Sequence, residues 1–576
     1  MGVALAYFVE RTLMPSSSTS ARAVLLAILL AAAAPYLVGL GGSSLWDANE
    51  AYYAETPREM VASGDYVNPS FNFQPRFNKP VLPYWVVAAS YHVIGVSERA
   101  ERVPIALGGL ILVATAFGLG SLVRSREAGL LAAIVLATSP RFLMFARRII
   151  IDVHVATFAG LTLLFFALAE ARPDRKRRYL VLMYLSVALG TLTKGPVAVL
   201  LPGLVFVMYL ALEGRLADVR HLMLPTGVLI GAAVVLPWYV LVYAQHGWPY
   251  ILSFVVGENL LRYTQTVGVQ SRGILFYPPV MLGDLFPWSV FLPCALLAAV
   301  PRWSCVAPPG PDAVTSRRTV RLLALWVAII VVFFSLSRTK QDLYILPIIP
   351  AEAALVGGLL AAGLDRAASR DAAAGLRWML FASGLIVLAA GAGLFGFFVL
   401  PGGYPLGGLP MASAFLGLGG ILTAAFGARK RLFAAAAALA VTFAAVSWCF
   451  VMVTLPDFER YKPVRPLAGV IQSRASKSAV IGYYRFAAPS MVFYLRRPVL
   501  ELSAPEEARA AFGFNTDVYF LMTESDYQDV REMLPVPTYI LDRQPFFDVK
   551  LRNFFDGTAM PQVLLVSNRP GERASP

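Results

Sequence analysis

Residues 21–40 read ARAVLLAILLAAAAPYLVGL, an apolar run that is long enough to cross a bilayer as a helix. Shortly after it, residues 45–59 read LWDANEAYYAETPRE and carry five charged side chains, namely Asp47, Glu50, Glu55, Arg58 and Glu59. Charged groups so close to an apolar span need partners or a function. A cleaved signal peptide is the alternative reading of residues 21–40, but the apolar runs downstream favour a membrane anchor.

The whole chain has the composition of a polytopic membrane protein. Its 576 residues are 57% hydrophobic and only 15% charged, and the mean hydropathy is +0.64. Apolar windows of about 17 to 25 residues predict about thirteen membrane-spanning helices. These windows lie near residues 22–41, 102–122, 127–144, 153–171, 179–193, 196–212, 222–243, 274–300, 319–337, 342–363, 376–399, 411–428 and 432–454.

Basic residues gather in every second short loop between these windows. With the amino terminus in the cytoplasm, all of these loops face the cytoplasm, as the positive-inside rule requires. The net charge of +14 therefore indicates anionic lipid and membrane topology, and we expect no nucleic-acid partner. The basic loops are residues 124–126, 171–179, 213–221, 316–318, 365–370 and 428–431.

Two segments complete the expected architecture. Residues 79–95, KPVLPYWVVAASYHVIG, are short for a span, and counting them as one would place the basic loops outside, so they predict an interfacial helix. The tail contains strand-like runs such as SAVIGYY and VYFLM between Pro and Gly breakers. We expect an all-α polytopic domain over residues 1–455, with interfacial helices in a first periplasmic loop at 42–101, and a periplasmic α/β domain over 456–576.

Lysine and arginine recur in the external loops, which the charge rule expects to be poor in them. Each of these cations alone is typical of a side chain that reaches toward lipid headgroups. Their recurrence on one face favours a substrate path, because cations on an apolar floor hold a phosphate or pyrophosphate well. The candidate phosphate- or substrate-binding residues are Arg58, Lys79, Tyr84, Arg147, Arg148, Lys194, Arg262, Lys340 and Tyr344; Lys340 and Tyr344, four apart, could share a helical face.

Three carboxylates on this face are candidate catalytic groups, because a carboxylate can take an acceptor's proton or stabilise an oxocarbenium-like sugar centre. Asp47 and Glu50 are three residues apart, so the alternative is an N-cap at Asp47 with Glu50 completing a capping box. Asp152 begins a predicted span, and pairing with Arg147 or Arg148 is its structural alternative.

Cysteine and histidine give no sign of a metal centre. Cys294, Cys305 and Cys449 are scattered, and the four histidines lack ligand spacing. The sequence therefore requires no cofactor, although paired carboxylates leave a divalent metal open.

Five ordered motifs resemble those of the GT-C membrane glycosyltransferases. The resemblance is strongest to the bacterial aminoarabinose transferase branch of the protein mannosyltransferase-like superfamily, and it covers roughly residues 40–350. The motifs are WDANEAYYAETPREM (46–60), FNKPVLPYW (77–85), TSPRFLMFARRIIIDVHVATF (138–158), TLTKGPVAVLLPG (191–203) and SRTKQDLYILPIIPAEAAL (337–355).

This resemblance implies a multi-pass enzyme of the bacterial inner membrane whose active site faces the periplasm. It would move 4-amino-4-deoxy-L-arabinose from undecaprenyl phosphate to a lipid A phosphate, act as a monomer and confer resistance to polymyxin and other cationic peptides. Asp47 matches the first-loop catalytic aspartate, Asp152 the second acidic position and Lys79 the lysine of the Lys-Pro motif. Asn78 departs from the pattern, because enterobacterial relatives commonly have glutamate there. Lys194, Lys340 and Tyr344 match donor-phosphate or cavity positions.

Two other functions fit the same features. A mannosyltransferase-like enzyme would use a polyprenyl-phosphate sugar with a protein or another glycan as acceptor. A flippase or transporter of lipid-linked sugars needs buried charges too, but it would more often show broken helices at the midplane and an internal repeat.

Overall fold

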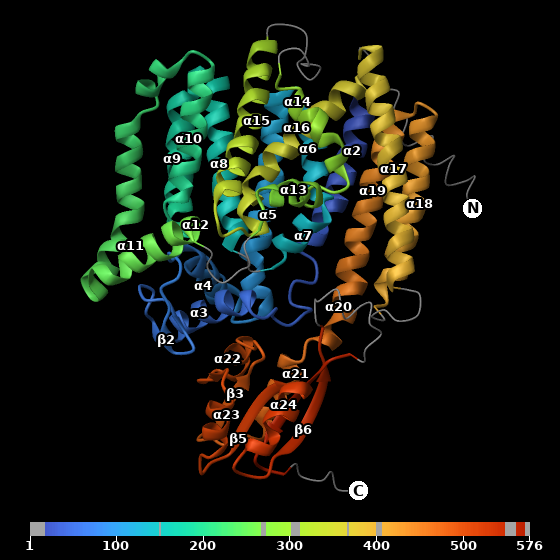
Figure 1. The fold of residues 1–576 in the computed structure, drawn as a ribbon. Helices are drawn as coiled ribbons and strands as arrows, with labels where there is room; N and C mark the ends of the chain where they lie inside the picture. The colour runs from blue at the N-terminus through green and yellow to red at the C-terminus, as the bar shows by residue number, and fades with distance from the viewer. Residues whose placement is uncertain are drawn as a thin grey trace.

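The computed structural model describes residues 18–148, 151–265, 272–300, 312–365, 368–398, 406–547 and 560–570. A bundle of long helices forms the larger part of the molecule, and a small α/β domain lies beyond one end of the bundle (Figure 1). Helices α3 (Asn49–Ser63) and α4 (Leu82–Ile94) lie between the two parts (Figure 1).

Within the described residues, eight helices are long and apolar enough to cross a membrane, and the number rises to ten if each of two bent helix pairs is one span. The predicted all-α polytopic architecture is therefore confirmed, while the total of about thirteen spans stays a prediction. The bent pairs are α6 (Arg126–Ala137) with α7 (Pro140–Ala146), and Ile274–Asp284 with Trp288–Leu297. The eight are α5 (Glu98–Val123), α8 (Ile151–Ala171), the run α11 to α12 (Leu224–Thr264), α15 (Ala313–Leu336), η8 with α16 (Asp342–Leu364), α17 (Arg370–Phe398), α18 (Gly408–Ala428) and the run that begins with α19 (Leu432–Tyr461).

Three more helices coincide with predicted spans: α2 (Ser18–Ala33), α9 (Lys176–Lys194) and α10 (Val197–Leu212). Helices α2 and α10 are apolar but short. Helix α9 ends on Lys194 because the next residue, Gly195, has a φ of 87°, a conformation that glycine adopts at little cost, and Pro196 follows it. A Cβ at Gly195 would lie 2.9 Å from the ring of Phe254. The turn therefore needs glycine, and it holds Lys194 at the end of its helix.

Ion pairs join the basic loops at the end of the bundle away from the α/β domain. Arg124 pairs with Asp365 at 2.9 Å, which links the loop after α5 to the loop after α16. Other pairs at this end are Arg22–Glu127, Arg215–Glu170 and Arg318–Glu213. The grouping of these loops on one side is thus confirmed, and α3 and α4 lie at the opposite end (Figure 1).

The first external loop contains short elements only. Helix α4 has 13 residues, and at 1.5 Å per residue it is about 20 Å long, too short to span a bilayer. The prediction that residues 79–95 do not cross the membrane agrees with this length. Between α3 and α4, strands β1 (Ser70–Phe71) and β2 (Gln74–Pro75) form an antiparallel hairpin.

The C-terminal part is a five-stranded sheet with helices, which confirms the predicted α/β domain. The strand order is β4-β3-β5-β7-β6, and the two predicted strands SAVIGYY and VYFLM correspond to β3 and β5. Strand β3 is parallel to β4 and β5, whereas β7 is antiparallel to β5 and β6. Successive side chains of β5 enter two apolar clusters on opposite faces of the sheet, so both faces are covered. The division between residues 455 and 456 stays a prediction.

The strands are β3 (Val480–Tyr484), β4 (Leu500–Leu502), β5 (Val518–Thr523), β6 (Tyr539–Pro545) and β7 (Gln562–Ser567). The helices around them are α21 (Val464–Arg474), α22 (Ser490–Leu495), α23 (Pro505–Phe512) and α24 (Glu524–Val530). Helix α22 contacts α3, so the C-terminal domain touches the first external loop directly.

Candidate active site

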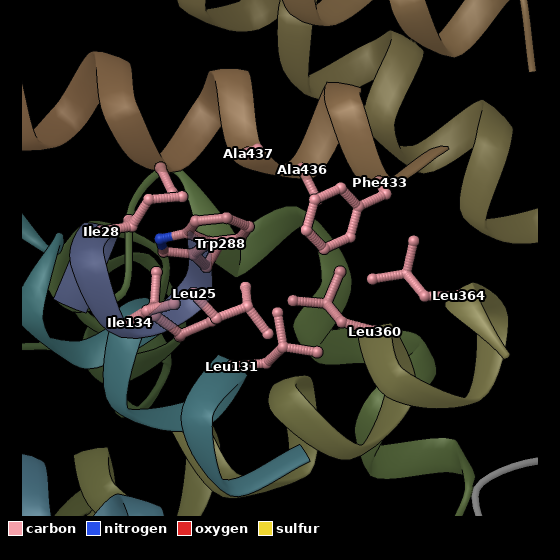
Figure 2. A pocket seen from close by; sticks show the side chains of 12 residues that line it. Leu25, Ile28, Leu131, Ile134, Trp288, Leu360, Leu364, Phe433, Ala436 and Ala437 are labelled. Carbon is pink, nitrogen blue, oxygen red and sulfur yellow. The ribbon is translucent and has the colours of Figure 1, made fainter. Parts of the chain in front are cut away.

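One pocket inside the bundle is wholly apolar in character. Figure 2 shows Leu25 of α2, Leu360 of α16 and Phe433 of α19 around the indole of Trp288. The indole nitrogen donates to the hydroxyl of Thr138 at 2.9 Å. No titratable side chain lines this pocket, so it is a gap in the packing and offers no chemistry for a polar substrate.

The first polar cluster joins two cations to one carboxylate near α4. Lys79 forms an ion pair with Glu258, and the other oxygen of Glu258 accepts from Arg262 Nη2 at 3.1 Å. Burial lowers the pKa of Lys79; the negative charge of Glu258 opposes this, and the positive charges of Lys194 and Arg262 add to it. Two cations against one carboxylate leave a positive charge that an anionic ligand can neutralise.

The second cluster joins Asp152, in the first turn of α8, to Lys194 at the end of α9. These two side chains form an ion pair, and the Lys194 ammonium lies 4.9 Å from the ring centre of Tyr344. The alternative that Asp152 pairs with Arg147 or Arg148 is wrong, because α9 supplies its partner. Lys194 keeps 20% of its side chain exposed, so the pair faces an accessible space.

Lys340 does not share a helical face with Tyr344, contrary to the interpretation of their spacing. It precedes η8 (Asp342–Ile348), and its buried ammonium donates to the carbonyl oxygen of Ser337 at 2.5 Å. The same segment is tied to the first cluster, because the backbone N–H of Thr339 donates to the carbonyl of Arg262. Lys340 therefore lies close to the candidate site, although its ammonium is held by the backbone.

Two tyrosines and two arginines complete this region. Tyr84 of α4 stacks on Tyr53 of α3, with ring centres 5.8 Å apart. Burial raises the pKa of Tyr84 to about 12, so its hydroxyl is a donor at neutral pH. Within the described chain, the Tyr84 hydroxyl, Arg76 Nε and Arg262 Nε are buried without a hydrogen-bond partner. Buried donors are nearly always paired in a folded protein, so these three groups are available to donate to a polar ligand.

Asp47 belongs to a different set of contacts, at the interface with the C-terminal domain. Its two oxygens accept from the backbone N–H of Ser490 at 2.7 Å and from the Ser490 hydroxyl at 2.6 Å. The N-cap of α3 is Ala48 and no side chain caps it, so the capping alternative for Asp47 is wrong. Burial raises the pKa of Asp47 from 3.8 to about 7, although both hydrogen bonds from Ser490 lower it.

Glu50 is held by Arg102 in a buried ion pair. Arg102 Nε donates to Oε1 at 2.7 Å and Arg102 Nη2 to Oε2 at 3.0 Å, while the backbone N–H of Trp46 donates to Oε2 at 2.7 Å. Burial alone would raise the pKa of Glu50, but the charge and hydrogen bonds of Arg102 outweigh it and hold the pKa below its usual range. Arg102 also donates to three carbonyl oxygens just before α3, so this pair fixes the start of the first loop.

We expect Arg102→Met to destabilise the protein strongly. The substitution leaves the Glu50 carboxylate, which is only 2% exposed, without its partner. A buried charge without a partner lowers the free energy of unfolding by about 3 to 5 kcal/mol. Thermal unfolding in detergent measures the change. The control is Arg22→Met, which breaks an exposed pair with Glu127 and should cost about 0 to 1 kcal/mol. Equal losses in the two variants would contradict the structural role of Arg102.

The remaining predicted arginines contact protein groups. Arg58 pairs with Glu55 at 2.5 Å, and Arg148 lies 4.1 Å from the ring centre of Trp46. Arg147 donates to the carbonyl of Val38 at 2.7 Å, and burial lowers its pKa to about 10. Their part in donor binding stays a prediction, since neither cation cluster includes them.

Metal ligation gains no support from the geometry. Among the described residues, no three His, Cys, Asp or Glu side chains gather as a metal-binding group. Cys294 and Cys449 are free thiols, and Cys305 lies outside the described residues.

Three residues of these clusters are not among the predicted site residues. Glu258 bridges Lys79 and Arg262, and its spacing of four from Arg262 on a helix is a signal that could have identified it. Arg76 precedes the Lys-Pro motif by three positions. Ser490 carries no local signal, because it meets Asp47 across 443 residues.

Comparison with protein families and relatives supports the resemblance seen in the motifs. Residues 78–241 match the family model described as dolichyl-phosphate-mannose-protein mannosyltransferase. The undecaprenyl phosphate-alpha-4-amino-4-deoxy-L-arabinose arabinosyl transferase of Pseudomonas paraeruginosa is 31% identical over 345 residues, which are 59% of this chain and 60% of the relative. The enzyme of the same name from Pectobacterium carotovorum is 28% identical over 348 residues, again 59% and 60% of the two chains. The matched region thus spans about three fifths of these curated relatives.

Solved structures extend the likeness to nearly the whole chain. The crystal structure of ArnT from Cupriavidus metallidurans bound to undecaprenyl phosphate has a TM-score of 0.76 and 21% sequence identity, over 97% of this chain and 100% of that one. The apo structure of the same protein gives a TM-score of 0.74 and 20% identity, over 96% and 100%. The chain therefore has the GT-C fold that its motifs predicted.

Proposed function

We propose that the protein is a polyprenyl-phosphate-sugar dependent glycosyltransferase that moves 4-amino-4-deoxy-L-arabinose from undecaprenyl phosphate to a lipid A phosphate. The main support is the pair of clusters Lys79–Glu258–Arg262 and Asp152–Lys194, which lie at one end of the bundle within electrostatic range of each other. These cations offer a place for the phosphate of the donor, and the carboxylates offer negative charge beside the sugar.

The reaction forms one bond and breaks another at the anomeric carbon. An oxygen of the acceptor phosphate attacks this carbon, and the bond to the donor phosphate breaks, so undecaprenyl phosphate leaves with one more negative charge. Lys79, Arg262 and Lys194 would stabilise this charge. Asp152 or Asp47 would stabilise the oxocarbenium-like centre. A lipid A phosphate is already anionic near neutral pH, so the acceptor needs no strong general base.

The choice of donor and sugar follows the names of the relatives, and the choice of lipid A as acceptor follows the resemblance of the motifs. Curated relatives are named as arabinosyl transferases for this undecaprenyl-linked sugar, and a protein of the same fold was solved with undecaprenyl phosphate bound. The clusters lie on the side opposite to the basic loops, which the charge rule assigns to the cytoplasm. We therefore propose a monomeric enzyme of the bacterial inner membrane with a periplasmic active site, which confers resistance to polymyxin.

A protein acceptor is the second candidate function. The family model that matches residues 78–241 describes protein mannosyltransferases. A hydroxyl acceptor, unlike a phosphate, would need a base, and Asp47 or Asp152 would supply it. A flippase would move the lipid-linked sugar without transfer.

Mass spectrometry of lipid A tests the proposal. Cells that express the protein should add a pentosamine to lipid A, and cells that lack it or carry Asp152→Asn should not. Unmodified lipid A in all strains would contradict the function, and a sugar found on proteins instead would select the second candidate. Donor that crosses the membrane without any product would indicate a flippase.

A further inference from the structure

Arg76 is a cation beside the candidate site that pairs with no carboxylate in the described part of the chain. Within the described residues, no acidic oxygen lies within 4.0 Å of its guanidinium, whereas Lys79, Arg262, Lys194 and Arg58 each pair with an acid. A guanidinium without an acidic partner keeps its charge available for an anionic ligand.

Aromatic rings hold Arg76 without using its hydrogen-bond donors. Its guanidinium lies 3.8 Å from the ring centre of Tyr52 and 5.7 Å from that of Phe71. Its backbone N–H donates to the carbonyl of Pro69 at 2.8 Å, which anchors the hairpin. Stacking fixes the plane of the guanidinium and leaves its N–H groups on the rim, an arrangement that suits a bidentate phosphate contact.

Two stacked tyrosines, Tyr53 and Tyr84, lie within electrostatic range of both Arg76 and the two charged clusters that we assign to the donor. The positive charge of Arg76 acts on the hydroxyls of Tyr53 and Tyr84, and the charges of Asp152 and Glu258 act on Tyr53 as well. Arg76 Nε and the Tyr84 hydroxyl are both buried donors that meet no hydrogen-bond partner among the described residues. An anion held here would therefore lie next to the donor phosphate without using the same cations.

We propose that Arg76, together with the Tyr84 hydroxyl, binds the phosphate monoester of the acceptor. This inference rests on the proposed function, in which an anionic acceptor must approach an anionic donor. Lys79, Arg262 and Lys194 offset the donor's charge, and a separate cation is needed to offset the acceptor's charge and to direct its oxygen toward the sugar. Arg76 stacks on the ring of Tyr52, and burial together with the negative charges of Glu501 and Asp47 raises the pKa of that tyrosine. Neither carboxylate forms an ion pair with the guanidinium of Arg76.

Initial rates of the purified full-length protein test this assignment. With lipid A as acceptor and undecaprenyl-linked aminoarabinose as donor, Arg76→Met should raise the acceptor KM by about 10- to 100-fold, as expected for the loss of charge-assisted hydrogen bonds. The donor KM should stay within about twofold, because the donor cations are intact. Lys79→Met is the matched variant and should raise the donor KM instead. Arg76→Lys should keep part of the acceptor affinity, since lysine retains the positive charge but lacks the planar pair of N–H donors of the guanidinium.

A second pair of measurements separates binding from structure. Thermal unfolding shows whether Arg76→Met folds; if it does not, Arg76→Lys and Arg76→Gln carry the test. An unchanged acceptor KM, or a rise in the donor KM of the same size, would overturn the assignment while the proposed function stands. If the wild-type protein transfers nothing to lipid A, the proposed function fails, and the assignment of Arg76 fails with it.

Discussion

Lys194→Ala is expected to lower kcat/KM for the lipid-linked donor by about 100-fold. The ammonium of Lys194 pairs with Asp152 and lies within electrostatic range of Lys79, where we propose that the donor phosphate binds. One charge-assisted hydrogen bond contributes about 1.5 to 3 kcal/mol, and about 1.4 kcal/mol corresponds to a factor of ten. Transfer rates with the donor varied at saturating acceptor measure the effect.

Loss of stability must be separated from loss of binding in this variant. Lys194→Ala leaves the Asp152 carboxylate, whose side chain is 12% exposed, without its partner. Adding Asp152→Asn removes the stranded charge, so the double variant should regain thermal stability without regaining activity. The control is Arg177→Ala, an exposed cation near the opposite end of α9, which should change neither property. Normal donor kinetics in Lys194→Ala would refute a donor-phosphate role for this residue.

The positions of the helices could be predicted from the sequence, because a helix that is buried in lipid needs a long window of apolar residues. Helix α4 was recognisable as a helix that does not cross the membrane from the charge rule, because a crossing there would have reversed the side of every basic loop. The bends within two helix pairs lie at Pro140 and Pro287, which are visible in the sequence, but the apolar windows 127–144 and 274–300 run through both prolines.

Pairing between side chains was much less predictable. Arg147 and Arg148 are the nearest cations to Asp152 in sequence, yet its partner is Lys194, 42 residues away, because α8 and α9 pack side by side. Arg147 instead donates to backbone carbonyls before the first loop. The sequence identified the types of charged residue at the site, while the fold decides which of them meet.

Asp47 is the clearest case of a contact that only the fold decides, because its partner Ser490 lies in the C-terminal domain. Its carboxylate accepts two hydrogen bonds from Ser490, but an ionised carboxylate has about four acceptor positions. It can therefore be held by the C-terminal domain and still face positive charge on the sugar. We interpret Ser490 as a positioning residue that orients Asp47.

Asp47→Asn should lower kcat by about 100-fold or more, whereas Ser490→Ala should lower it by about 3- to 10-fold. In the Asp47→Asn background, Ser490→Ala should have little further effect, because the group that it orients is gone. Equal losses in the two single variants would indicate that Asp47 only docks the C-terminal domain. Full turnover in Asp47→Asn would exclude a direct part in transfer.

The pH dependence of the rate distinguishes the two roles. Burial raises the pKa of Asp47 to about 7, so an active carboxylate gives a rate that falls as the pH drops through about 7. The fall in rate at low pH is the acid limb of the pH–rate profile. The hydrogen bond from the Ser490 hydroxyl lowers the pKa of Asp47, so Ser490→Ala should move this acid limb to higher pH, and Asp47→Asn should abolish it. The stability of the fold depends on pH in the opposite sense. The contribution of Asp47 to the free energy of unfolding is fully present below its ordinary pKa of 3.8 and is lost as the pH rises through about 7.

Asn72→Ala is the matched control for loss of docking, because Asn72 joins the same loop to the C-terminal domain without touching Asp47. Its amide donates to the carbonyl of Val499 at 2.8 Å and accepts from the N–H of Val499 at 2.9 Å. Weakened docking alone should lower the rate of Asn72→Ala at every pH and leave the acid limb in place. If Asn72→Ala and Ser490→Ala shift that limb equally, the domain acts on the site as a whole, and the hydrogen bond of Ser490 to Asp47 has no special part in it.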